Sequence, residues 1–313
     1  MDAPLESGLH APLVVTGVGS LVLAPARAGE EDPSVDAARE VAPWLKSKKM
    51  RKFMGKQDQL AVAAAGRAAK DAALDERTLR ERTGLYLCVG HIPFERAQIE
   101  AIARGSIQAD EFCMERFSTT AFERVNPLLT FRCLPNMPAF HVSLNLGMRG
   151  PYFVTYPCAG QFYLALECAT AALESGEVDV ALVGAVADQN NFLVAYHFRR
   201  TSDSRKLTAW EGIDAGAFLC LETRDGARRR NAEVKAELLS SEVSYAAPDS
   251  WGESRPFAES VTFAGVKTVA AKPTAASLPV SLSHAAGGAG KGEFVHQLST
   301  AGGVEATSRW RVV

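Results

Sequence analysis

Residues 152–161 read Tyr-Phe-Val-Thr-Tyr-Pro-Cys-Ala-Gly-Gln, and they form the centre of a strand–turn–helix pattern. The aromatic and β-branched side chains of 152–156 are typical of a strand. Beyond Pro157, apolar side chains recur at 162, 165, 166, 169 and 173, which is the spacing of one helical face. The stretch therefore predicts a strand that passes directly into a helix, with Cys158 at the junction.

A cysteine at such a junction has two possible roles. The N-terminus of a helix carries about half a positive charge and unpaired N–H groups. Both favour the thiolate, so we expect a lowered pKa for Cys158 and a reactive sulfur. The same amides suit a developing oxyanion. The alternative role is a small buried hydrophobic residue, which is commoner for a single cysteine.

The chain on both sides of this unit alternates between β-branched runs and helical patterns. Apolar runs typical of strands occupy residues 14–19, 83–90, 178–186 and 215–222, with further strands near 234–239 and at 307–313. Residues 59–73 are rich in alanine and predict a helix, whereas 28–45 is typical of a surface loop. This alternation predicts an α/β fold with a mostly parallel sheet.

Composition excludes several classes of protein. The 313 residues are 47% hydrophobic and 22% charged, as in ordinary globular proteins. The formal net charge of −2 argues against a general nucleic-acid binder. No apolar run is long enough to span a membrane, and the N-terminus does not resemble a signal peptide. Six scattered cysteines without a CxxC pair indicate reduced thiols, so we expect a cytoplasmic protein.

Several segments together resemble the β-ketoacyl synthases, the elongating enzymes of the thiolase fold. The likeness covers nearly all of residues 13–222 and is carried by 15–19, 50–74, 126–143, 147–151 and 174–184. It implies a thiolase-like layered αβαβα fold with a shortened C-terminal half. In that fold, residues 1–225 form the ketosynthase-like N-terminal half, and 226–313 form the reduced C-terminal half. Cys158 falls where the family keeps its acyl-accepting cysteine.

The catalytic set that the resemblance implies is incomplete. The family uses two histidines and a lysine beside the cysteine. Residues 281–290, with His284, resemble the second histidine motif followed by an Ala/Gly-rich helix. Pro279 stands where the family keeps its lysine, and Ser283 replaces a glycine. The stretch also aligns with the first histidine motif, and under either alignment only one of the two histidines is present.

Two functions follow from this pattern. The first is a ketosynthase-like or chain-length-factor-like subunit of a type II fatty-acid or polyketide synthase. Such a subunit pairs with an active ketosynthase and shapes its acyl tunnel, with Phe140, Phe153 and Phe162 as candidate lining residues; the alternative for each phenylalanine is ordinary core. The second is an acyltransferase or condensing enzyme that uses Cys158 as nucleophile and His284 as base.

The remaining signals concern partners and ligands. A homodimer is the alternative to pairing with an active ketosynthase. The basic cluster at residues 48–52 suits an acidic acyl carrier protein, although a solvated basic face is the default interpretation. The histidines show no HxH or HxxxH spacing, so we expect no metal site. Neither residues 287–292 nor 17–22 completes a phosphate-binding or dinucleotide-binding motif, so we expect no cofactor.

Overall fold

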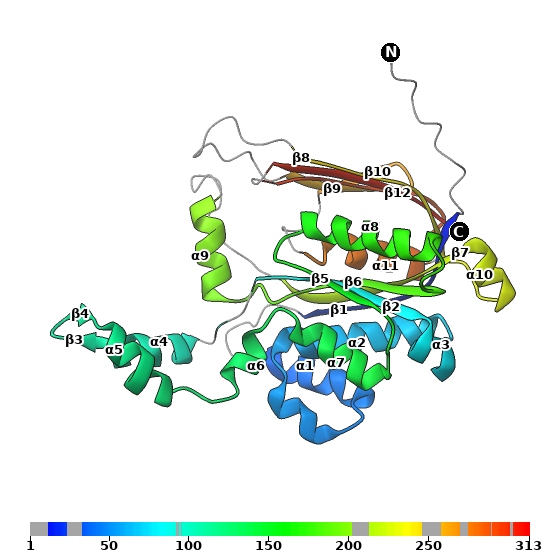
Figure 1. Cartoon of the computed structure of the whole chain (residues 1–313). Helices are drawn as coiled ribbons and strands as arrows, with labels where there is room; N and C mark the ends of the chain where they lie inside the picture. Colours follow the sequence, from blue (N-terminus) through cyan, green and yellow to red (C-terminus); the bar gives the residue numbers. More distant parts are fainter. Residues whose placement is uncertain are drawn as a thin grey trace, which may run out of the picture.

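The computed structural model describes residues 12–23, 33–91, 94, 96–201, 213–245, 258–269, 275–288, 290–300 and 303–313. Ten of its strands form one sheet that bends into two halves, one stacked above the other (Figure 1), and two short strands form a separate sheet. In spatial order, the first half contains β5 (Tyr152–Thr155), β2 (Thr83–Val89), β6 (Val180–Ala187), β7 (Asp214–Thr223) and β1 (Leu13–Leu23). The second half contains β8 (Ala236–Tyr245), β12 (Val304–Val312), β11 (Gly292–Ser299), β9 (Ala258–Phe263) and β10 (Val266–Val269).

The halves meet where β8 pairs with β1 at only two positions, Val14 with Glu237 and Val15 with Ala236. The prediction of a mostly parallel sheet is wrong. Among the described strands, β2 runs parallel to β5 and to β6, and every other pairing is antiparallel. Short connections such as 264–265 join neighbouring strands of the second half, and these require antiparallel pairing.

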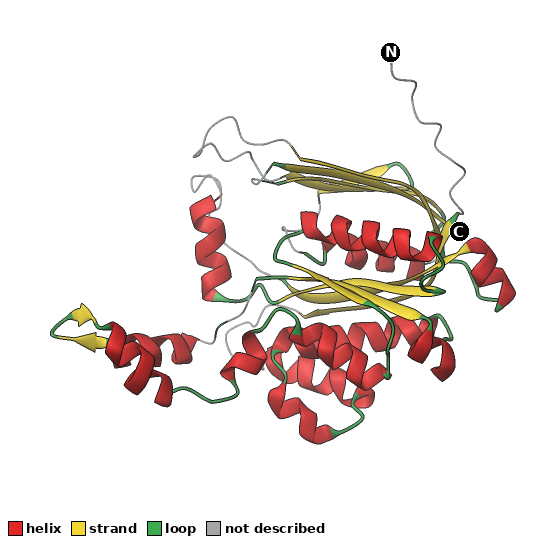
Figure 2. Ribbon diagram, viewed as in Figure 1, coloured by secondary structure: helices red, strands yellow, loops and turns green. Residues whose placement is uncertain are grey.

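Helices pack on both faces of the first half (Figure 2). On its outer face lie α1 (Pro33–Val41), α2 (Lys56–Asp71) and α7 (Met137–Leu146). Between the two halves lie α8 (Gly160–Glu174) and α11 (Ser277–Gly287). Within the described residues no helix covers the outer face of the second half. The order is therefore helix, sheet, helix, sheet, which confirms the layered α/β prediction with a shortened C-terminal half.

The other described elements are short. They are η1 (Ala42–Trp44), η2 (Lys48–Phe53), α3 (Glu76–Glu81), α4 (Arg96–Gly105), β3 (Ile107–Gln108), β4 (Glu111–Phe112), α5 (Met114–Arg116), η3 (Phe117–Ala121), α6 (Leu129–Cys133), α9 (Phe192–Thr201) and α10 (Arg224–Arg229). Of the loop predicted at 28–45, residues 28–32 lie outside the described residues, and the prediction is wrong for 33–41. Residues 33–41 form α1 because Ala37 and Val41, one helical turn apart, are buried against the core.

Glycines in β1 set the distance between the first half-sheet and α2. A Cβ atom at Gly19 would lie 2.2 Å from the carbonyl oxygen of Ala64, and one at Gly17 would lie 2.5 Å from that of Ala68. These contacts are with helix backbone, which cannot rotate away. The small side chains on both elements therefore allow α2 to lie directly on β1, and this contact buries residues 60–65 of the helix.

We expect the substitution Gly19→Ala to lower the free energy of unfolding by about 1–3 kcal/mol, because its methyl group would push α2 off β1. Denaturant titration followed by circular dichroism measures this loss. Gly287→Ala is the matched control, because a Cβ at that position meets no atom within 4 Å beyond its chain neighbours and its own helix backbone. Equal stability of the two variants would contradict the close-approach argument.

Candidate functional site

The carboxyl ends of the three parallel strands form one end of the first half-sheet. Cys158 follows β5, His91 follows β2 and Asp188 follows β6. Ligands of open α/β sheets bind at this position, outside the carboxyl ends of the strands. The candidate site is therefore built on this end.

Cys158 lies at the junction of β5 and α8, as the sequence predicts. Its thiol is half-buried, and its carbonyl oxygen accepts a hydrogen bond of 3.4 Å from the Cys88 thiol. Burial raises the pKa of the Cys158 thiol above its ordinary value, and the amides of Gln161 and Gly160 lower it by less. The predicted lowering of the pKa is therefore wrong, because desolvation outweighs the helix N-terminus.

The start of β12 marks the end of the molecule at which Cys158 lies. Val304 packs against the first residue of α8: a Cβ atom at Gly160 would lie 2.9 Å from its side chain. β12 then runs for nine residues to Val312, a span of about 27 Å at the usual rise of a strand. Residues beside Val312 are therefore at the opposite end from Cys158.

His284 lies toward that opposite end. It occupies the last turn of α11, with an exposed side chain, and the chain continues to Gly292, which pairs with Val312. The prediction of an Ala/Gly-rich helix after His284 is wrong. The helix lies mostly before His284, because Leu278 and Leu282 on that stretch are buried in the core. The structure does not bring His284 to Cys158.

The three predicted tunnel residues lie in two environments. Phe162 is fully buried in the layer between the half-sheets, which fits the core alternative. Phe140 on α7 and Phe153 on β5 are exposed, at 49% and 37% of their surfaces. The lining of an acyl tunnel by these side chains stays a prediction.

Two histidines for which the sequence spacing predicted no role lie close together at the same end of the sheet as Cys158. The rings of His91 and His197 lie 4.4 Å apart between centroids, and the ring of Tyr156 contacts His91 edge-on at 6.2 Å. Burial, with a smaller effect of His197, lowers the pKa of His91 to about 4, and burial also lowers the pKa of His197. No local sequence signal could have paired them, because β2 and α9 meet only in the fold.

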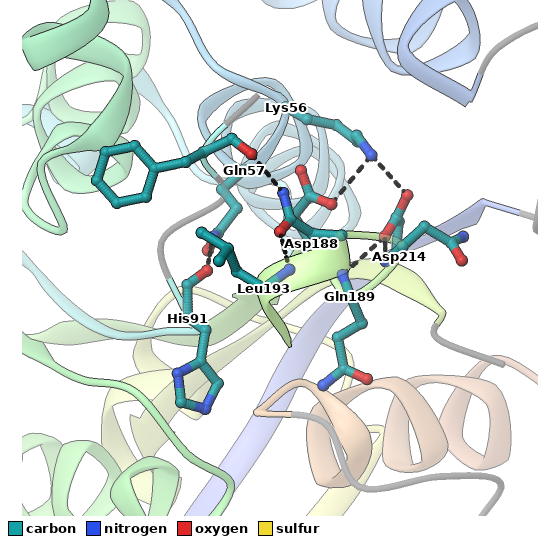
Figure 3. Close-up of polar contacts among 10 residues, drawn as sticks. Lys56, Gln57, His91, Asp188, Gln189, Leu193 and Asp214 are labelled. Carbon is teal, nitrogen blue, oxygen red and sulfur yellow. Dashed lines mark hydrogen bonds and ion pairs between the residues drawn. The ribbon is translucent and has the colours of Figure 1, made fainter. Parts of the chain in front are cut away.

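A buried ion-pair network lies beside this pair (Figure 3). Lys56, at the start of α2, contacts Asp188 at 3.0 Å and Asp214 at 2.8 Å. Asp214 also accepts hydrogen bonds from the backbone amides of Gln189 and Asn190. Burial and the charge of Asp214, opposed by Lys56, raise the pKa of Asp188 to about 6. These contacts connect the loop after β6 to the start of α2 and to the start of β7.

The imidazole of His91 points away from Lys56 in the close-up (Figure 3). Its backbone carbonyl accepts a 2.7 Å hydrogen bond from the Gln57 side chain. The main chain of His91 is therefore held by α2. Its ring points in the opposite direction and contacts the ring of Tyr156.

The site as built has limited capacity for nucleophilic catalysis. Cys158 carries a thiol whose pKa is raised, and a base must remove its proton before attack. A histidine with a pKa of about 4 is a weak base for such a thiol. The Gln161 amide donates to the carbonyl oxygen of Cys158 at 2.9 Å, so the Gly160 amide is the neighbour of the sulfur that can hold a negatively charged oxygen.

Exposed apolar side chains lie on β5 and on α7, the helix before it; among the described strands, β5 is an edge strand that pairs with β2 alone. Tyr152 and Phe153 on β5, Tyr156 after it, and Phe140 and Leu144 on α7 are all exposed. Edge strands of this kind offer unpaired backbone groups to another chain. Among the described helices, none is long and apolar enough to cross a membrane.

A model of one protein family matches residues 21–206 of this chain: the N-terminal domain of the β-ketoacyl synthases. The mitochondrial 3-oxoacyl-[acyl-carrier-protein] synthase of Arabidopsis thaliana is 26% identical over 215 residues, 63% of this chain and 43% of that protein. The 3-oxoacyl-[acyl-carrier-protein] synthase 2 of Staphylococcus aureus is 22% identical over 245 residues, 70% of this chain and 57% of that protein. The chain spans about half the length of these curated relatives.

Solved structures share the fold. A chain of the AntDE:AntF complex, a type II polyketide synthase acyl carrier protein with its ketosynthase bound to the hexaketide, superposes with a TM-score of 0.68. That similarity has 14% identity and covers 97% of this chain and all of the other. The ishigamide ketosynthase/chain length factor superposes with a TM-score of 0.52 at 22% identity, over 76% of this chain and 65% of the other.

We expect Cys158 to react with iodoacetamide at pH 7.5 more slowly than free glutathione, because burial raises the pKa of its thiol. Peptide mapping by mass spectrometry gives the alkylation rate at this one cysteine as a function of pH. The rate should still be rising at pH 9. A plateau below pH 7 would instead indicate a lowered pKa and an activated nucleophile.

The raised pKa of Asp188 predicts a specific dependence of stability on pH. The folded chain holds the Asp188 proton more tightly than the unfolded chain, so this group stabilises the fold at low pH, and its contribution declines as the pH rises from about 4 through 6. Asp188→Asn lacks this titration. The unfolding free energy of wild type minus that of the variant should therefore fall as the pH rises from 4 to 7, and a rise would contradict the shift.

Proposed function

This chain belongs to the β-ketoacyl synthase family, and we propose that it is a chain-length-factor-like subunit of a type II fatty-acid or polyketide synthase. In this role it pairs with an active ketosynthase and helps to shape the acyl tunnel of that partner. Residues 1–225 supply the ketosynthase-like half of the fold, and residues 226–313 a reduced second half. The subunit works in the cytoplasm with an acyl carrier protein.

The state of Cys158 carries this proposal. The pKa of its thiol is raised. His284 lies in the last turn of α11, away from Cys158, and His91, whose pKa is about 4, is a weak base. An enzyme that decarboxylates malonyl units needs groups that activate the thiol and stabilise the resulting enolate. The described residues supply the sulfur and its neighbouring amides without a matched base. A companion subunit needs the fold but not this chemistry.

The edge of the first half-sheet supports pairing with another ketosynthase-like chain. Among the described strands, β5 pairs along one edge alone; Tyr152 and Phe153 on it are exposed, as are Phe140 and Leu144 on α7, the helix that precedes it. Burial of this patch would remove a large apolar area from water, at about 25 cal/mol per Å² of surface. Interface centres are typically rich in such aromatic residues. Phe140 and Phe153 would then face the partner.

A second apolar surface supports the same role. The segment from α4 to η3 extends away from the layered body (Figure 1). It exposes Ile107, Phe112, Met114 and Phe122, and the Phe112, Phe117 and Phe122 rings contact one another in sequence. Clustered exposed apolar residues on a projecting segment are typical of protein interfaces. The segment suits an arm that lies against a partner chain.

The surface of η2 suits an acyl carrier protein. Lys48, Lys49, Arg51 and Lys52 are all exposed on this short helix. Their positive charges would attract an acidic carrier protein and speed its encounter. One solved relative, a type II polyketide synthase ketosynthase, is itself complexed with its acyl carrier protein.

The second candidate function is acyl transfer through Cys158, with His284 as base. The observation that favours it is the approach of the Gly160 amide to the sulfur. This donor would stabilise the oxyanion formed when the thiol attacks a thioester. This candidate requires His284 to act from a different position in the assembled complex.

Intact-protein mass spectrometry distinguishes the two candidates. The purified chain is incubated with acyl-loaded carrier protein, beside the variant Cys158→Ala. We expect no acyl adduct on either chain, because the Cys158 thiol is protonated and lacks a matched base. An adduct that is present on wild type and lost in the variant would establish acyl transfer and overturn the companion role.

Pairing is tested by co-expression with an active ketosynthase from the same source and size-exclusion chromatography of the purified complex. We expect Phe153→Asp to weaken the complex at least tenfold, because it places a charge in the apolar patch beside β5. Tyr245→Asp is the matched control, since Tyr245 is also an exposed aromatic residue but lies on β8. Equal complexes for wild type and Phe153→Asp would contradict this interface.

A further inference from the structure

We propose that Cys88 is a resolving cysteine for Cys158, and that the two thiols form a reversible disulfide within the chain when a hydroperoxide oxidises Cys158. Cys88 lies on β2 and Cys158 at the junction of β5 and α8, so the bond would join the sheet to the start of this helix. The proposal does not depend on the proposed function, because it concerns two thiols of the isolated chain and holds for either candidate role.

Strand pairing places Cys88 beside the turn that carries Cys158. It is opposite Thr155 in the parallel pair of β2 and β5, and Thr155 precedes Cys158 by three residues. The Thr155 hydroxyl donates to the carbonyl of Gln161 on α8 at 2.9 Å, so this side of the strand faces the helix. Cys88 faces the same way, because directly paired residues of neighbouring strands lie on one face of a sheet.

The contact between the two residues carries the proposal. The Cys88 thiol donates to the carbonyl oxygen of Cys158 at 3.4 Å. That oxygen lies about 2.4 Å from the Cα of its own residue, so the Cys88 sulfur is at most about 5.8 Å from the Cys158 Cα. A disulfide between the two residues would place this sulfur about 4 Å from the same Cα. A side-chain movement of at most about 2 Å therefore gives the geometry of a bond.

The charge interaction between the two thiols agrees with this contact. Burial raises the pKa of the Cys88 thiol to about 12; a hydrogen bond from Thr155 opposes this effect, and the charge of Cys158 adds to it. Because a Coulomb interaction weakens with distance, the effect of Cys158 indicates that the sulfurs are near each other. The pKa of the Cys158 thiol is also raised, so near pH 7 both groups are neutral and do not repel each other.

The order of the reaction follows from the different exposure of the two thiols. Cys158 is half-buried and within reach of a small hydroperoxide, whereas Cys88 is fully buried. The Cys158 sulfur attacks one peroxide oxygen and the O–O bond breaks, which gives a sulfenic acid and releases an alcohol or water. The Cys88 sulfur then attacks the Cys158 sulfur, the S–O bond breaks, and the leaving hydroxyl takes the Cys88 proton to form water. Each sulfur loses one electron, and the peroxide gains both.

The presence of Cys88 determines what oxidation does to Cys158. A sulfenic acid without a neighbouring thiol is oxidised further to a sulfinic acid, which ordinary thiols do not reduce, whereas they do reduce a disulfide. Burial raises the pKa of the Cys158 thiol, so its first oxidation is slow near pH 7 and becomes faster as the pH rises. The disulfide therefore forms under sustained exposure to peroxide, and it protects Cys158 from permanent loss.

Peptide mapping after oxidation tests the proposal. The reduced full chain is treated with hydrogen peroxide at pH 8.5, blocked with N-ethylmaleimide, digested without reductant and analysed by mass spectrometry. We expect a cross-linked peptide pair that joins Cys88 to Cys158, and at least a tenfold loss of Cys158 alkylation that dithiothreitol restores. In Cys88→Ser the cross-link should be absent, and dithiothreitol should not restore alkylation, because Cys158 proceeds to the sulfinic acid.

Cys220→Ser is the matched control, because Cys220 is also fully buried, and burial raises its pKa to about 12 as well. This variant should form the cross-link as wild type does, and circular dichroism before oxidation establishes that each variant is folded. If Cys88→Ser does not fold, the wild-type peptide map decides alone. Oxidation of Cys158 without the cross-link would overturn the proposal. So would resistance of Cys158 to millimolar peroxide at pH 9, a bond from Cys158 to another cysteine or another chain, or full recovery of Cys158 in folded Cys88→Ser.

Discussion

The two-position pairing between β1 and β8 determines the shape of the whole molecule. Strand β1 pairs with β7 along nearly its full length but with β8 only at Val14 and Val15. Beyond Val15 the two half-sheets separate, and the wedge between them must be filled with apolar side chains. Helices α8 and α11 fill it, contributing fully buried residues such as Phe162, Tyr163 and Leu282. The layered fold follows from this divergence.

The same wedge determines the chemistry at its open end. α8 begins there, so amides of its first turn lie near the Cys158 sulfur, yet the filling of the wedge also removes water from the thiol. These two consequences act in opposite directions on the thiol pKa. The partial charge of a helix N-terminus acts over one turn, whereas burial acts on the whole ion, so burial prevails. A fold that packs this position tightly therefore keeps the sulfur as a thiol unless another group is added.

The sequence was sufficient for features that depend on local pattern. The β-branched run at 152–155 and the helical spacing from Phe162 to Leu173 correctly located β5, α8 and the cysteine between them. Local pattern was insufficient where the structure of a segment depends on the elements against which it packs. Residues 277–287 form a helix because Leu278 and Leu282 enter the wedge, and this depends on β1 and β7. The pair His91–His197 and the network around Lys56 join residues that are distant in sequence, so spacing rules could not reveal them.

Loss of catalytic groups is compatible with an intact fold because different residues carry the two properties. The fold rests on the glycines of β1 that admit α2, on the wedge-filling helices, and on the buried contact of Tyr163 with His296 at 2.7 Å between α8 and β11. None of these contacts uses the Cys158 sulfur or His284. Substitutions around the sulfur therefore change reactivity without a matching loss of unfolding free energy. Under the proposed function, a ketosynthase fold keeps its layers and its edge strand for a partner without a complete set of acid–base residues.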